Sequence, residues 1–119
     1  MDRVNLAGKL ARVDRHWTPA IVADLNDHQV KVVKIQGAFE WHHHEREDEL
    51  FLVVKGRFCM EFRDRSVWLE TGDLIVVPKG VEHRPVAEAE CEIVLIEPAT
   101  TLNTGNVRSE RTVDTLQRL

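Results

Sequence analysis

The sequence has no apolar run long enough to cross a bilayer, and its longest apolar stretches have the length of β-strands. Residues 1–10 lack the apolar core of a signal peptide. We therefore expect a cytoplasmic protein with no membrane partner. Cysteine is also scarce, because Cys59 and Cys91 are the only two and lie far apart in the chain. This spacing excludes a CxxC metal or redox motif and favours two free thiols in a reducing compartment.

Positive charge is not clustered anywhere in the chain. The formal net charge is −4, and arginines such as Arg63 and Arg65 alternate with acidic residues. A phosphate-binding face needs grouped Lys and Arg, so we expect no nucleic-acid partner. The sequence also lacks a Ser-His-Asp grouping with a nucleophile elbow, a Cys-His pair for nucleophilic catalysis, and a glycine-rich loop that opens a helix.

The chain is long enough for one domain, and 43% of its 119 residues are apolar, which is enough for a core. Short apolar segments recur between glycine and proline turns, which predicts an all-β sandwich or barrel over residues 29–98. Residues 1–28 form an N-terminal extension with a short helix over 5–12 and a strand over 21–25. Residues 99–119 form a C-terminal extension that ends in a short helix or lies across the barrel or a partner. The strands expected in the barrel are 30–36, 38–44, 50–54, 57–63, 66–70, 74–77, 83–87 and 91–97.

Four residues of the barrel region have the chemistry of metal ligands. Alternation along a strand places His42 and His44 on one face, about 7 Å apart. Glu49 begins the next strand after a charged turn, and His83 follows the Pro78-Lys79-Gly80 turn. Three neutral imidazoles and one carboxylate suit one divalent iron, manganese, nickel, copper or zinc ion, with open positions for water or substrate.

The triplet of histidines leaves two registers open. The middle residue, His43, is expected to point to the opposite face together with Trp41. A slip of one residue would turn His43 inward instead and remove His42 and His44 from the site. The register with two inward ligands is preferred because it completes the set.

The spacing of these residues resembles both motifs of the cupins. The first motif is matched by Gly37, His42-x-His44, four residues, Glu49, six residues and Gly56. The second is matched by Gly72, five residues, Pro78-x-Gly80, two residues and His83. Two departures are a gap after Gly37 that is one residue shorter than usual and Ala87 in place of an asparagine that is not a ligand in the family.

The resemblance implies a double-stranded β-helix, or jelly-roll barrel, with the ligands inside. Cupins include dioxygenases, isomerases, decarboxylases, sugar-binding regulators and storage proteins, so the fold is implied more firmly than the activity. The leading hypothesis is a metal-dependent enzyme, dioxygenase-like or isomerase-like, that acts on a small polar molecule. The alternatives are a cupin that binds or senses a small ligand without turnover, and a metal-free structural cupin. Candidates for the wall of a substrate pocket are Phe51, Met60 and Phe62, which also suit the core.

The outer face of the barrel carries apolar residues that a monomer would leave in water. We expect Phe39 and Trp41 opposite His42, and a second group opposite Glu49, formed by Leu50, Leu52 and Val54. Many small single-domain cupins are homodimers, and a second subunit would cover this face. Coverage by the N-terminal segment of the same chain is the alternative.

Overall fold

The architecture is all-β apart from one short helix, as the spacing of strand and turn signals predicts. The structure is a computed structural model that describes residues 1–119. No helix in it has the length and apolar character needed to span a membrane. In chain order the elements are α1 (Leu6–Leu10), β1 (Ala20–Leu25), β2 (His28–Ala38), β3 (Glu49–Lys55), β4 (Phe58–Phe62), β5 (Ser66–Leu69), β6 (Leu74–Val77), β7 (His83–Pro98) and β8 (Gln117–Arg118).

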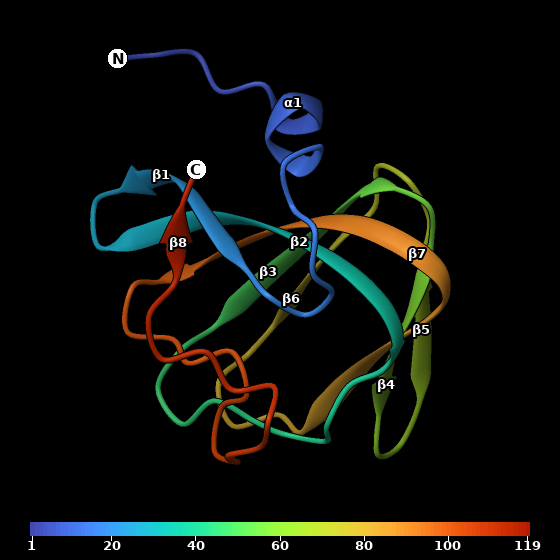
Figure 1. Ribbon diagram of the computed structural model, residues 1–119. Helices are drawn as coiled ribbons and strands as arrows, with labels where there is room; N and C mark the ends of the chain where they lie inside the picture. The colour runs from blue at the N-terminus through green and yellow to red at the C-terminus, as the bar shows by residue number, and fades with distance from the viewer.

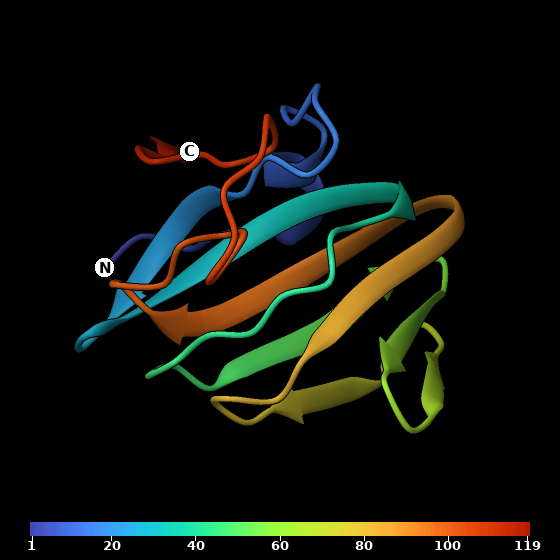
Figure 2. The same cartoon turned by 90° about the horizontal axis from the view of Figure 1, so that it is seen from below.

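The long strand β7 organises the sheet. It pairs with β2 over most of its length, with β4 through its first residues and with β3 through its second half, always antiparallel. The strand order is β5-β4-β7-β2-β1-β8, and β6 joins the sheet through β3. Figure 1 shows β2 and β7 as two long curved ribbons, and Figure 2 shows β3 and β6 on the far side of β7 from β2. This curvature gives the sheet a concave inside, where the main core lies.

Alternation along the strands decides which side chains lie inside. In β3, Glu49, Phe51 and Val53 are buried, whereas Leu50 and Leu52 point to the outer face and are half-buried. The inner core continues the same pattern in the neighbouring strands and contains Val33, Ile35, Phe58, Met60, Leu69, Val77, Ile93 and Leu95. The sequence prediction for β3 is therefore confirmed side chain by side chain.

The N-terminal segment covers part of the outer face. Leu10 of α1 and the nearby Val13 pack against Val32 of β2 and Val94 of β7 in a second, smaller core. The face is not covered everywhere, because Leu74 and Val76 of β6 remain exposed. Coverage by the N-terminal segment, the alternative to a second subunit, is thus found for part of this face, and a second subunit over the remainder stays a prediction.

Two local expectations were wrong, and the alternatives left open for the C-terminal stretch are decided. No strand forms over 38–44, because β2 ends at Ala38, and His42 makes only an isolated bridge to His83. Segments 83–87 and 91–97 are one strand, β7, because β2 follows it across a bulge. The C-terminal stretch forms turns and the short β8 rather than a helix, and it lies across the barrel (Figure 1). Each error concerns pairing between distant segments, which local alternation does not specify.

Candidate metal centre

The four expected ligands come together inside the barrel. His42 and His44 lie on the connection between β2 and β3, Glu49 begins β3, and His83 begins β7. All four side chains are buried, and one donor atom of each lies within 4.8 Å of all the others. Ligand bonds of about 2.1 Å place donors on opposite sides of an ion about 4.2 Å apart, so the cluster is close to the size that one ion requires.

Backbone hydrogen bonds orient two of the rings. Nδ1 of His42 lies 2.8 Å from the carbonyl oxygen of Glu40, and Nδ1 of His83 lies 2.8 Å from that of Val81. A carbonyl oxygen only accepts, so each Nδ1 must be the protonated nitrogen. Nε2 of each ring is therefore free to act as a ligand, an arrangement typical of histidines that bind metals.

Several buried polar atoms of the cluster have no hydrogen-bond partner. Oε1 of Glu49 lies 2.9 Å from Nε2 of His44 and 3.2 Å from Nε2 of His83, yet none of these three atoms makes a hydrogen bond of acceptable geometry. Buried polar groups are normally satisfied, so three orphan atoms at one point need an explanation. A divalent cation bound by the three atoms would supply one, and the donor set therefore fits a metal.

The electrostatics of the cluster favour neutral imidazole beside a carboxylate. Burial and the neighbouring His83 lower the pKa of His42 to about 4. Burial alone would raise the pKa of Glu49, but the adjacent carboxyl of Glu97 and the rings of His44 and His83 outweigh it and hold that pKa well below its usual range. These are the protonation states in which both groups bind metals.

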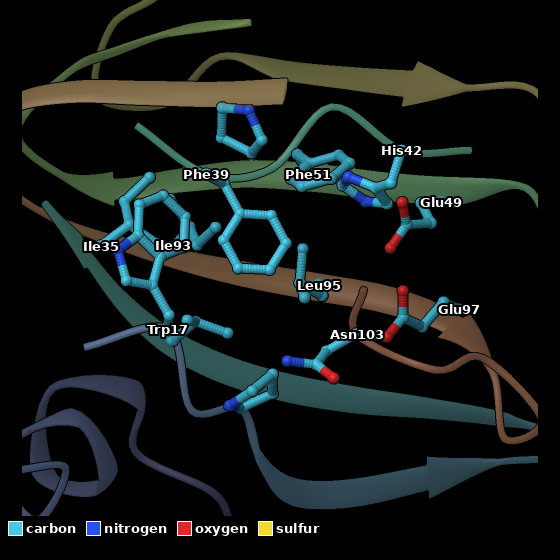
Figure 3. A pocket seen from close by; sticks show the side chains of 13 residues that line it. Trp17, Ile35, Phe39, His42, Glu49, Phe51, Ile93, Leu95, Glu97 and Asn103 are labelled. Atoms are coloured by element: carbon cyan, nitrogen blue, oxygen red, sulfur yellow. The ribbon is translucent and has the colours of Figure 1, made fainter. Parts of the chain in front are cut away.

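A second carboxyl group lies next to Glu49. Glu97 of β7 is buried, and its Oε1 accepts a 2.7 Å hydrogen bond from Nζ of Lys31, which is also buried. Figure 3 shows the carboxyl groups of Glu97 and Glu49 facing one another. Burial and the charge of Glu49 raise the pKa of Glu97 well above its usual range, against the opposing effect of Lys31. The pKa values of these two neighbouring carboxyl groups are therefore displaced in opposite directions.

A small cavity of about 40 Å³ opens onto one side of the cluster. His42, Glu49, Glu97 and Asn103 form its polar end, and the remaining wall is apolar (Figure 3). The apolar lining consists of Trp17, Pro19, Val33, Ile35, Phe39, Phe51, Pro85, Ile93 and Leu95. The cavity has room for roughly three water molecules.

The cavity wall differs from the expected one. Phe51 lines the cavity, but Met60 and Phe62 do not, because β4 packs them into the core beyond it. Phe39 was expected to face away from His42, yet it lies in the cavity wall with its ring centroid 5.3 Å from that of His42. Alternation fails there because the strand has already ended. Trp41 does face outward, where the guanidinium of Arg63 lies 3.8 Å from its ring centroid.

Sequence reasoning missed Lys31 and Glu97, although a signal was present. Lys31 shares its inward face with Val33 and Ile35 of β2, and Glu97 shares its own with Ile93 and Leu95 of β7. A charged residue on the inward alternation of a buried strand indicates a partner or a site. Besides Glu49, the chain contains one such residue of each sign, on two strands that pair.

Known proteins resemble this chain in sequence and in structure. A crystal structure of a cupin-2 domain containing protein from Shewanella frigidimarina is 44% identical, covers 80% of this chain and 93% of its own, and superposes with a TM-score of 0.79. The uncharacterized protein YdbB of Bacillus subtilis is 33% identical over 87 residues, which are 64% of this chain and 77% of YdbB. An acireductone dioxygenase of Bacillus licheniformis is 29% identical over 87 residues. These cover 69% of this chain but only 49% of that enzyme.

The family model of the cupin domain matches residues 29–97, which are more than half of the chain. Together with the 44% identity over most of the Shewanella protein, this match confirms the resemblance given by the two motifs. The chain is a member of the cupin family and has its jelly-roll fold.

Proposed function

We propose that this protein is a metal-dependent enzyme of the dioxygenase type that acts on a small molecule with an apolar body. The observation that carries the proposal is the meeting of two features. Three ligand atoms lack hydrogen-bond partners, and an apolar, aromatic-walled cavity is lined at one end by two of the proposed ligands, His42 and Glu49. His42, His44, Glu49 and His83 are the proposed ligands. Ferrous iron is the proposed ion, in preference to manganese, nickel, zinc or copper.

The protein's own residues would bind the metal ion, hold its ligands in orientation and surround the site with an apolar wall. When bound, a redox-active ion supplies Lewis acidity and electron transfer at an open coordination position. His42 and His83 offer nitrogens that backbone carbonyls have already oriented, which lowers the cost of binding. Phe39 and Phe51 place apolar surface beside the cluster, which lowers the local polarity and strengthens the electrostatic interactions there.

The cavity favours an oxygenase over an isomerase of sugars. A sugar needs many hydrogen-bonding groups around it, and apart from two proposed ligands only Glu97 and Asn103 are polar here. The amide of Asn103 is already occupied, because it donates to the carbonyl of Arg111 and accepts from the N–H of Val113. The similarity to an acireductone dioxygenase supports the same choice.

Elemental analysis tests the proposal most directly. The untagged protein, purified without chelators, would be compared with a His42→Ala/His44→Ala double variant. One iron per chain, lost in the variant, followed by oxygen uptake with a panel of small apolar enols and phenols, is the expected result. Ligand binding without any product would favour a sensing cupin instead. A wild-type protein that stays empty after anaerobic reconstitution with each candidate metal would disprove the metal site.

The outer face of β3 and β6 supports a further part of the proposal, that the protein forms a homodimer. Leu50 lies opposite Val76 and Leu52 opposite Leu74 in the pairing of the two strands, so their side chains form one apolar patch. Leu74 is 57% and Val76 50% exposed, while the N-terminal segment covers the neighbouring strands. A second copy of the same patch would bury it.

A further inference from the structure

The connection that carries His42 and His44 has a neighbouring strand on one side only. On that side it bonds to the start of β7, through Phe39 to Pro85 and through the bridge between His42 and His83. The N–H of Gly80 binds the carbonyl of His44. The residue between the ligands, His43, has no partner in the barrel for either of its backbone groups. A loop with free backbone groups is a poor platform for two metal ligands, because their relative position is then set by few contacts.

The C-terminal segment, residues 99–113, supplies the missing partners. The side-chain Oδ1 of Asn106 accepts a 2.8 Å hydrogen bond from the backbone N–H of His43, and the backbone N–H of Asn106 donates to the carbonyl of His43 at 3.0 Å. One residue of this segment thus satisfies both backbone groups of His43. It replaces a strand at the position midway between two proposed ligands.

Gly105 allows this close approach. Its φ is +58°, and a Cβ atom built on it would lie 2.3 Å from the carbonyl oxygen of His43 and 3.0 Å from Cδ2 of His42. No side chain fits at the first of these distances, because the obstacle is backbone that cannot swing aside. The C-terminal segment therefore lies directly against the backbone of one histidine and the ring of another.

Hydrogen bonds within the C-terminal segment fix its conformation. Thr104 is fully buried, and its hydroxyl makes a 2.7 Å hydrogen bond with that of Thr112. The amide of Asn103 bonds to Arg111 and Val113, as described above. These contacts hold Gly105 and Asn106 in place independently of the histidines, so the segment can impose a position on the loop instead of following it.

We infer that Asn106 is a positioning residue of the metal centre, which fixes the backbone between His42 and His44 so that both rings reach one ion. This inference rests on the proposed metal site and assigns a role to the C-terminal segment. Removal of the side chain frees the N–H of His43 and lets the loop relax. Removal of this side chain should lower the metal affinity and alter the geometry of the site more than it lowers the stability of the fold, because Asn106 is exposed.

The test compares Asn106→Ala with Asn106→Asp, which keeps an Oδ acceptor, and with Ser109→Ala as a matched control. Ser109 lies in the same segment and accepts from the N–H of Arg111, but no hydrogen bond links it to the histidine loop. Co²⁺ is the probe, and three quantities are measured: its affinity by chelator competition, its ligand-field absorption spectrum, and the urea unfolding of the metal-free protein.

In Asn106→Ala we expect Co²⁺ affinity to fall about tenfold, as for other changes next to a ligand shell, with an altered spectrum. Asn106→Asp should restore both, and Ser109→Ala should change neither. If Asn106→Ala unfolds more easily without metal but binds Co²⁺ with the affinity and spectrum of the wild type, the residue is merely structural and the inference is overturned. If the wild type itself binds no metal, the proposed function fails first and the positioning role fails with it.

Gly105→Ala provides a second and stronger perturbation. The added methyl group must push the segment away from the carbonyl of His43, which breaks the hydrogen bonds of Asn106 without altering its side chain. We expect weaker Co²⁺ binding than in Asn106→Ala. A Gly105→Ala protein that folds and binds Co²⁺ as tightly as the wild type would contradict the inference independently.

Discussion

Inside the barrel, Nε2 of His44 lies 2.9 Å from Oε1 of Glu49, with both side chains buried and neither atom in a hydrogen bond of good geometry. The ring of the preceding residue, His43, lies outside and approaches the exposed Glu45 at 3.2 Å. Neighbouring histidines thus have opposite environments. In the metal-free protein the contact between His44 and Glu49 is unfavourable, because both polar atoms are desolvated without full compensation. An ion bound between them would offset that cost.

Replacement of these two histidines should therefore have unequal effects. His44→Ala removes a buried ligand and should reduce metal occupancy severely while the barrel stays folded. His43→Ala leaves all four ligands and the backbone contact to Asn106 in place, so occupancy should remain near the wild-type value. Metal analysis beside circular dichroism measures both effects. If His43→Ala strips the metal and His44→Ala does not, the register assigned to the loop is incorrect.

The low pKa of His42 predicts a pH dependence of the metal-free protein. This pKa is about 4 in the folded protein and near 6.5 when unfolded, so the unfolded chain binds more protons between these values. The contribution of neutral His42 to stability is complete above about pH 6.5 and is lost as the pH falls toward 4. The loss is roughly 3 kcal/mol at most, because each pKa unit corresponds to about 1.4 kcal/mol.

Urea unfolding at several pH values, with a chelator present, checks this slope. His42→Gln removes the titrating ring and should flatten the loss of stability toward acid. His43→Gln changes the neighbouring histidine whose ring lies outside the barrel and serves as the control, with the slope of the wild type. An unchanged slope in His42→Gln would show that His42 is not the group responsible.

The buried pair of Lys31 and Glu97 predicts strong non-additivity. Glu97→Leu leaves Nζ of Lys31 buried without its carboxyl partner, which should cost about 3 kcal/mol of unfolding free energy, and Lys31→Met is the other single variant. A Lys31→Met/Glu97→Leu double variant removes both polar groups and should recover most of that loss. Urea denaturation of the singles and the double gives the coupling energy, and simple additivity would contradict a direct interaction. The exposed pair of Arg118 and Asp24 is the control, since Arg118→Ala should barely change stability.

How much the sequence could predict depends on the range of each interaction. The spacing of His42, His44, Glu49 and His83 matched both cupin motifs and so predicted a cluster that the structure does bring together, although the first two lie on a connection and not on the expected strand. Phe39 was misplaced because alternation ended with β2. The roles of Glu97 and Asn106 could not be predicted, since pairing with Lys31 and with the backbone of His43 depends on contacts across more than sixty residues.

The proposed dimer can be tested at the apolar patch of β3 and β6. Leu74→Lys/Val76→Lys places two ammonium groups on side chains that are already exposed, so the subunit should fold normally, but a symmetric interface would bring like charges together. Sedimentation should show a dimer for the wild type and a monomer for this variant, with unchanged metal content. Leu25→Lys alters an equally exposed leucine on β1 and should remain dimeric. A variant of the patch that still sediments as a dimer would move the interface elsewhere, and a monomeric wild type would exclude the dimer and leave the patch open to another protein.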